Sequence, residues 1–290
     1  MPTPAEGESA QRARPRRRWW PWGVVVGSVA VVIWTVGSGF MGSKHAEVIS
    51  PSDADLEVVS QGRIFFGHQS VGANLIAGLG MISEDAGIPL RISESNGGPP
   101  SDGGTVAHAA VGVNGEPETK IDEFVALIDA GIGGSVDVAL LKFCYVDVTA
   151  ATDIDALLAS YTEMVETLQA RYPGSTFLYA TVPLTRERDL KETIKAWFGR
   201  GEGVGPEDNV AREKFNAALR ERLDGTGLLF DIAAVESRME LSGAQHTHGG
   251  ETYYALDDAW ASDPGHLNDA GSRAVAGEFV RVIAAALAQR

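Results

Sequence analysis

Two short polar stretches carry side chains that could perform nucleophilic chemistry together. In "GRIFFGHQSVGANLIAGL" Ser70 ends a polar triplet that lies between an apolar run and a helical pattern, and in "SDPGHLN" Asp263 lies three residues before His266. With Pro-Gly between them, the carboxylate can turn back to accept from imidazole Nδ1–H, which leaves Nε2 free to take a proton from a hydroxyl. The residue types and the Asp–His spacing therefore indicate a Ser-His-Asp arrangement for acyl transfer.

Each stretch also has a simpler interpretation. Ser70 precedes a helical pattern, so its hydroxyl could cap the first free N–H groups of a helix. The same N–H groups could instead hold an oxyanion formed beside that hydroxyl. The second stretch could be a turn followed by a helix cap at Asn268 or Asp269, with His266 in solvent. Local sequence leaves both alternatives open.

The elements that would position these residues alternate along the chain. Candidate strands lie at 63–67, 90–93, 136–143, 176–182 and 228–232, and helical patterns lie at about 71–86, 119–130, 154–171, 208–223 and 268–289. Several strands are continuous apolar runs, which is typical of a sheet covered on both faces. The pattern predicts one α/β domain with a parallel sheet of about five strands between two helical layers. Residues that follow the strands should then meet at the carboxyl edge of the sheet.

Together, the two motifs resemble the SGNH/GDSL hydrolase superfamily. "FGHQSVG" stands in the place of the family's Gly-Asp-Ser block, and "DPGHLN" stands in the place of its C-terminal Asp-x-x-His block. The resemblance spans roughly residues 60–288 and implies a flavodoxin-like three-layer α/β/α fold. It also implies Ser70 as the nucleophile, His266 as the base and Asp263 as the third triad member, with no cofactor.

The predicted oxyanion hole departs from the family pattern. The family usually has Gly-x-Asn-Asp after the third strand, whereas this chain has "CYVD", with Val146 where the donating Asn would be. The Ser70 backbone N–H is one predicted donor. The family's second block supplies a glycine N–H, and "VGVNGEP" offers Gly112 or Gly115, with Asn114 as a substitute side-chain donor.

Four further residues are predicted to contact substrate because they follow the first and third strands. They are His68, Gln69, Tyr145 and Asp147. His68 and Gln69 replace the family's Gly-Asp before the serine. His68 could equally be a buried core histidine, and Tyr145 and Asp147 could belong to a capped loop after a strand.

Two other groups of polar residues have several interpretations. "HTH" (His246 and His248) could hold a metal with Asp257 or Asp258, but a polar loop without metal is the favoured interpretation, and no metal is predicted.

Lys142 lies inside the third predicted strand, where lysine is unusual, and it could pair with Asp147 or another carboxylate, or lie at a strand edge. Cys144 is the only cysteine, so no intramolecular disulfide can form, and its apolar surroundings favour a buried small side chain.

The N-terminus predicts membrane insertion. The basic "RARPRRRWWPW" precedes an apolar run, and no charged residue occurs from Trp19 to Ser43. We expect a basic cytoplasmic tail (1–21), a transmembrane anchor or signal segment (22–42), a linker (43–57) and an extracytoplasmic hydrolase-like domain (58–290). A single anchor is favoured over a cleaved signal peptide, which would release the domain as a secreted protein.

Charge and motifs together limit the function. Five Arg and two Glu give residues 1–43 a net charge of +3, so the total of −15 leaves −18 on the rest of the chain, which argues against nucleic acid as a partner. The favoured hypothesis is a membrane-anchored serine esterase or deacetylase acting on small-molecule or glycan O-acyl esters. The alternatives are an O-acyltransferase using the same triad and a non-catalytic envelope-binding module in a degenerate hydrolase fold.

Overall fold

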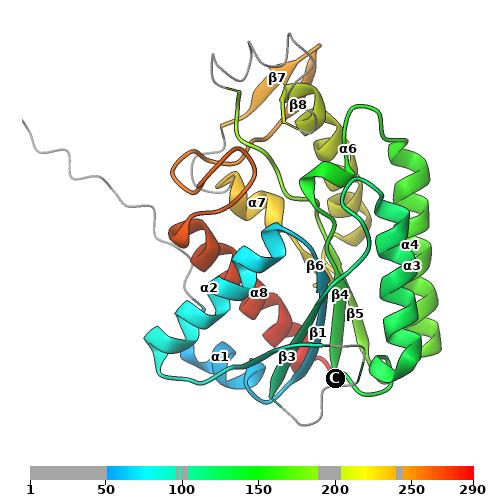
Figure 1. Cartoon of the computed structure of the whole chain (residues 1–290), viewed down its shortest axis with the longest axis vertical. Coiled ribbons are helices and arrows are strands. Elements are labelled where there is room, and N and C mark those ends of the chain that lie inside the picture. Colours follow the sequence, from blue (N-terminus) through cyan, green and yellow to red (C-terminus); the bar gives the residue numbers. More distant parts are fainter. Residues whose placement is uncertain (1–50, 96–97, 99–103, 189–203, 240–243) are drawn as a thin grey trace, which may run out of the picture. The chain divides into compact units, whose positions relative to one another are not determined.

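The computed structural model describes residues 51–95, 98, 104–188, 204–239 and 244–290 (Figure 1). The predicted basic tail, the apolar segment and most of the predicted linker lie outside these ranges. Within them, no helix combines the length and the apolar character needed to cross a membrane.

A parallel sheet forms the centre of the domain. In the described ranges it has six strands: β1 (Arg63–His68), β2 (Arg91–Glu94), β3 (Thr105–Ala110), β4 (Val138–Leu141), β5 (Thr176–Ala180) and β6 (Leu229–Phe230). Their order is β2-β3-β1-β4-β5-β6, and every neighbouring pair is parallel. Without the edge strand β2, this is the flavodoxin-like order, in which the connection reverses between β1 and β4. A ligand site is therefore expected outside the carboxyl ends of these two strands.

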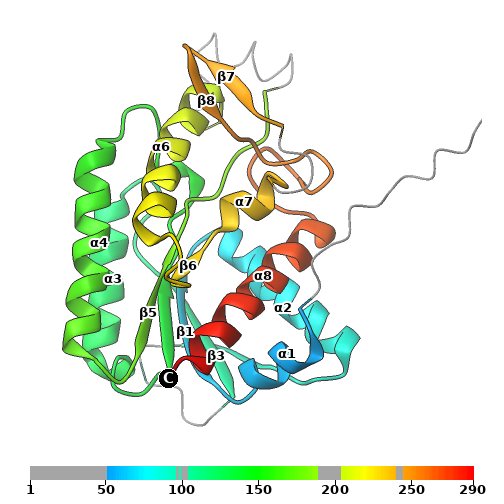
Figure 2. The ribbon, with the colours of Figure 1, turned by 180° about the vertical axis from the view of Figure 1, so that it is seen from behind.

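Helices cover both faces of the sheet, as Figures 1 and 2 show from opposite sides. One layer contains α1 (Asp53–Val59), α2 (Val71–Ala86), α7 (Ile232–Glu236) and α8 (Asp269–Ala288), and the other contains α3 (Pro117–Leu127), α4 (Ile154–Arg171) and α6 (Pro206–Leu223). Each layer has its own apolar core. Phe66 of β1 packs against Phe279 of α8 in one core, whereas Phe65 of β1 packs against Phe124 of α3 in the other.

Smaller elements complete the fold. They are the helical turns η1 (Ile128–Ile132) and η2 (Tyr145–Asp147) and the antiparallel hairpin of β7 (His246–His248) and β8 (Glu251–Tyr253). The hairpin contains the "HTH" stretch. Among the described residues, no cluster of three or more His, Cys, Asp or Glu side chains could hold a metal ion.

The predicted α/β architecture is confirmed, with two differences. Strand β3 was not predicted, because its "TVAHAA" follows a Gly- and Pro-rich stretch and contains few β-branched residues. Helix α1 begins within the predicted linker, where Ser52 and Asp55 form a capping box and Leu56 and Val59 are buried. The folded domain therefore begins before residue 58.

Candidate active site

The structure brings the three predicted triad side chains together although they come from opposite ends of the chain. Ser70 Oγ lies 2.6 Å from His266 Nε2. On the other side of the imidazole, Nδ1 lies 3.0 and 2.9 Å from the two carboxylate oxygens of Asp263. This continuous hydrogen-bonded chain has the connectivity that proton transfer from a serine hydroxyl requires.

The backbone at Ser70 is strained. Ser70 is the residue before α2 and has φ 49° and ψ −109°, in the positive-φ region that side chains other than glycine rarely adopt. Its hydroxyl makes no capping hydrogen bond with the helix and contacts His266 instead. The capping interpretation of Ser70 therefore does not describe the structure. Within the described residues, the Ser70 N–H donates to no protein group, so it is available at the helix start.

Asp263 is held in a tight turn beside His266. Its Oδ1 accepts from the backbone N–H groups of Gly265 and His266, both at 2.9 Å. Partial burial alone would raise the pKa of Asp263, but these hydrogen bonds and the one from the imidazole outweigh it and lower the pKa. The carboxylate therefore stays ionised where it can orient the imidazole.

The ring of Tyr145 packs against this turn. Its ring lies edge-on to the His266 ring, with 5.9 Å between centroids. Gly265 packs against the same ring, since a Cβ at Gly265 would lie 2.4 Å from a Tyr145 ring carbon. Of the predicted substrate-contacting residues, Tyr145 is the one that the structure places beside the triad.

Two helices hold Ser70 and His266 in register. Helices α2 and α8 lie side by side over one face of the sheet (Figure 1), and Gly78 permits their close approach because a Cβ there would lie 2.1 Å from the Ser272 carbonyl oxygen. At the start of α8, Asn268 accepts from Gly271 N–H, so the predicted cap exists together with the histidine contact. Asn74 on α2 donates to Leu267 O at 3.2 Å and accepts from Leu267 N–H at 3.4 Å.

Asn74 was not singled out from the sequence. It lies four residues after Ser70 and therefore on the same helical face, a spacing that could have identified it.

The N–H groups of the two glycines predicted as oxyanion donors are not free in the structure, which corrects that prediction. Gly112 N–H donates to Glu123 Oε2 at 2.7 Å, and Gly115 N–H donates to Asp147 Oδ1 at 2.8 Å. Both N–H groups are thus occupied by carboxylates. Asn114 is an exposed residue, and Lys120 Nζ donates to its side-chain oxygen at 2.8 Å.

Three of the predicted substrate-contacting residues are structural instead. His68 is buried, with Nε2 3.1 Å from His108 Nδ1, and burial together with Lys142 and His108 lowers its pKa to about 3. Gln69 uses its side-chain amide to bind the carbonyls of Val111 and Gly112, which ties the end of β1 to the loop after β3.

The carboxylate of Asp147 is buried and accepts hydrogen bonds from three donors. Its Oδ2 accepts from Lys120 Nζ at 2.5 Å and Cys144 N–H at 2.6 Å, in addition to the Gly115 contact at Oδ1. Sequence reasoning could not foresee this burial, because it depends on Lys120, which arrives from α3.

Arg212 supports the site from behind and was also missed from the sequence. Its guanidinium is fully buried, donating to Tyr145 O at 3.0 Å and to Thr185 Oγ1 at 3.0 Å. Burial lowers its pKa to about 10. Arg212 therefore joins the loops after β4 and β5. The helical pattern at 208–223 predicted the helix that carries it, but that pattern alone does not indicate a buried arginine.

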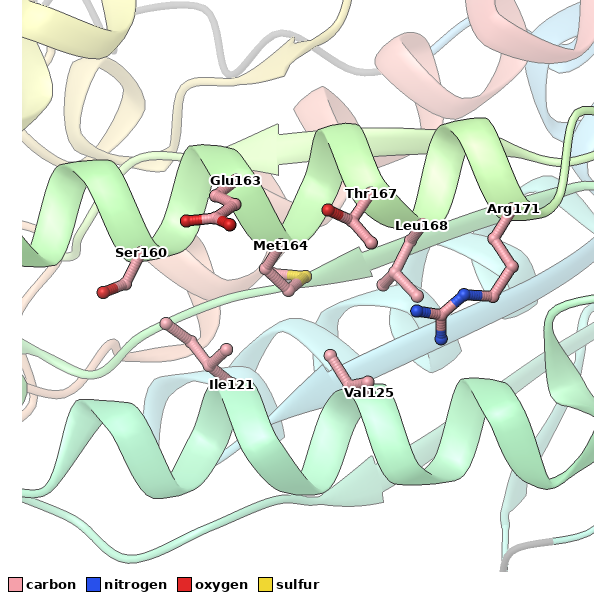
Figure 3. Close-up of a pocket in the computed structure, with 8 residues that line it drawn as sticks. All are labelled: Ile121, Val125, Ser160, Glu163, Met164, Thr167, Leu168 and Arg171. Carbon is pink, nitrogen blue, oxygen red and sulfur yellow. The ribbon is translucent and has the colours of Figure 1, made fainter.

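Two grooves on the described surface lie away from the triad. One, of about 250 Å³, lies between α3 and α4 and is drawn in Figure 3, where Ile121 and Val125 face Met164 and Leu168. The other, of about 360 Å³, lies among α1, α2 and α8, beside the Arg273–Asp85 ion pair.

Comparison with known proteins gives only distant similarities. No family model and no curated protein matches the chain. One similar solved structure is described as a platelet activating factor from Streptococcus pneumonia, with 15% identity and a TM-score of 0.45 over 81% of this chain and 85% of that one. A second is a lipolytic protein of the G-D-S-L family from Desulfitobacterium hafniense DCB-2, with 10% identity and a TM-score of 0.43 over 76% of this chain and 98% of that one. A third is the periplasmic domain of a lipopolysaccharide acetyltransferase from Salmonella ser. Paratyphi A, with 14% identity and a TM-score of 0.45 over 82% of this chain and 91% of that one.

The chain resembles the SGNH/GDSL superfamily in its fold class and in the order of its two motifs. The residue assignments rest on the geometry of this chain.

Proposed function

We propose that this protein is a serine esterase or deacetylase that hydrolyses O-acyl esters through an acyl-enzyme. The observation that supports this most directly is the hydrogen-bonded chain from Ser70 Oγ through His266 to Asp263, built on a strained serine whose hydroxyl is not used as a helix cap. A structural serine at a helix start would use its oxygen for the free N–H groups.

The proposed mechanism follows from these contacts. His266 Nε2 takes the proton of Ser70 as Oγ attacks the ester carbonyl, and Asp263 stabilises the imidazolium. When the tetrahedral intermediate collapses, the carbon–oxygen bond to the alcohol breaks, and the imidazolium protonates the leaving oxygen. Water, deprotonated by His266, then attacks the acyl carbon, the bond from this carbon to Ser70 Oγ breaks, and the imidazolium returns the proton to Oγ as the acid leaves.

The oxyanion is proposed to be held by the Ser70 N–H and by the side-chain amide of Asn114. The first donor lies at the N-terminus of α2, where the helix dipole favours negative charge. The second would take the place of the Asn that Val146 replaces. Lys120 orients it by holding Oδ1, which leaves the two N–H bonds of the amide to face away from that lysine.

The proposed setting is outside the cytoplasm, with the domain attached to the membrane through residues 22–42. The basic cluster followed by a long uncharged run supports this orientation. In that setting O-acylated glycans of the cell envelope are the proposed substrate class.

The proposal is tested by comparing the full-length wild type with Ser70→Ala and with Ser135→Ala, which removes a serine hydroxyl from the turn after η1. All three are treated with a fluorophosphonate probe and assayed with a short aryl acetate. Ser70→Ala is expected to lose labelling and to lose turnover by at least about 1,000-fold, while Ser135→Ala keeps both.

Two other results would redirect the proposal. A folded wild type that neither labels nor turns over would favour the non-catalytic binding module. A wild type that labels, but transfers the acyl group to a sugar hydroxyl in preference to water, would favour the acyltransferase.

A further inference from the structure

Lys142 is fully buried behind the candidate nucleophile. It follows β4, and its backbone N–H donates to Gly67 O, which fixes it beside the end of β1. From there its Nζ reaches the carbonyl oxygen of Gln69 at 3.3 Å. This carbonyl belongs to the same peptide group as the Ser70 N–H, the proposed oxyanion donor.

We propose that Lys142 is a positioning residue for the oxyanion: by donating to Gln69 O, it polarises the Gln69–Ser70 peptide and makes the Ser70 N–H a stronger donor. This inference rests on the proposed esterase function.

The physical basis is the resonance of the peptide bond. A donor on the carbonyl oxygen draws electron density from the nitrogen, so the N–H carries more positive charge and binds an anion more strongly. The effect is larger where the surroundings are dry, and the lysine side chain is completely shielded from solvent. The partner N–H remains free of protein acceptors among the described residues.

Stability does not account for a lysine at this position. Among the described residues, no carboxylate lies within 4.0 Å of Nζ, since Asp147 is paired with Lys120 instead. The other polar atom near Nζ is Cys144 Sγ, at 3.9 Å. Burial lowers the pKa of Lys142, because an ammonium group without an ion-pair partner at this distance is costly to bury. A side chain retained at such a cost, in contact with the nucleophile's own peptide, indicates a role in the chemistry.

The test uses the full-length protein with Lys142→Met and Lys142→Gln, and Tyr161→Phe as the matched control. Tyr161→Phe also removes a fully buried donor, one that contacts the carbonyl of the neighbouring Leu141. We measure kcat and KM on an aryl acetate, the melting temperature, and the inhibition constant of an aryl trifluoromethyl ketone, which forms an oxyanion adduct with the serine.

Both Lys142 variants are expected to lose about 10- to 100-fold in kcat with little change in KM, because the contact acts on the transition state. Inhibitor affinity should fall in parallel, and Tyr161→Phe should change neither. Since methionine is apolar and similar in length, Lys142→Met is expected to melt no lower than the wild type.

Two outcomes would overturn the inference. One is a folded Lys142→Met or Lys142→Gln with unchanged kcat and inhibitor affinity. The other is a Lys142→Met that melts far below the wild type or does not fold, which would show that the lysine is retained for stability. Failure of the esterase proposal is a separate result, namely a folded wild type with no turnover and no Ser70 labelling.

Discussion

The two halves of the candidate site are built differently. In the nucleophile half, each side chain already has the partner that proton transfer needs: Ser70 contacts His266, and His266 contacts Asp263. In the oxyanion half, the N–H groups of Gly112 and Gly115 are both taken by carboxylates. A proton relay depends on side chains that a motif identifies, whereas an oxyanion hole depends on where the backbone of a loop points. Changes in one half should therefore have effects that the other half does not reproduce.

The largest expected effect after loss of the nucleophile itself comes from Asp263→Asn. An amide at this position would favour the wrong imidazole tautomer, and the same change in a serine protease lowers kcat by about 10,000-fold. We expect a decrease of about 1,000- to 10,000-fold in kcat on an aryl acetate, together with slow fluorophosphonate labelling of Ser70.

Asp258→Asn is the matched control, because this carboxylate precedes the same loop and its side chain is 81% exposed. It should keep wild-type activity. If Asp263→Asn retained more than about a tenth of the wild-type kcat, the proposed role of Asp263 would be wrong.

In the oxyanion half, Asn114→Ala is expected to lower kcat by about 100-fold while the Ser70–His266 contact persists, because it removes one donor to the transition-state charge. KM for the aryl acetate should change little. Glu123→Gln provides the comparison, since it weakens the acceptor that holds Gly112 N–H.

If Asn114 is the second donor, Glu123→Gln should leave kcat near the wild-type value. A rise in kcat with Glu123→Gln, with no loss in Asn114→Ala, would instead return the role to the Gly112 N–H.

The part of the fold that is periodic and locally capped could be predicted from sequence. The helices at 71–86 and 154–171 have the predicted bounds, and Asp153 caps the second of them by accepting from Ala156 N–H. The strand β3 has few β-branched residues, and α1, although capped by Ser52 and Asp55, has only seven residues, too few for a helical period to show. Their stability comes from packing against α8 and β1, which are far away in sequence.

In the candidate site, too, some features could be expected from the sequence and others depend on tertiary packing. The contact between Ser70 and His266 was expected from their residue types and from the placement of both segments at the carboxyl edge of the predicted sheet. The burial of His68 did not, because it depends on Gly72 lying over the imidazole, where a Cβ would come within 2.3 Å of the ring. Residues next to a nucleophile can thus be core residues, and only the tertiary packing distinguishes the two.

The smallest expected effect concerns Glu236, a fully buried carboxyl on α7. Burial raises its pKa to about 8, although Leu184 N–H donates to Oε2 at 2.6 Å. Because this pKa is above that of the unfolded chain, the folded state holds a proton that the unfolded state releases. Its contribution to stability is therefore complete below the unfolded pKa of about 4.5 and is lost as the pH rises through about 8.

Glu236→Gln stays neutral at every pH and keeps an oxygen for Leu184 N–H. We expect its melting temperature to be near that of the wild type at pH 5 and to exceed it by several degrees at pH 9, because a change of 1 kcal/mol moves the melting temperature of a domain of this size by about 2–4 °C. Thermal unfolding of both proteins across this pH range gives the comparison. A variant that melts lower at all pH values would show instead that Glu236 is ionised in the folded protein and stabilises the buried cations Lys142 and Arg212, whose charges act on its pKa. In that case the cations behind the two halves would share a counter-ion, and changes in one half should be felt in the other.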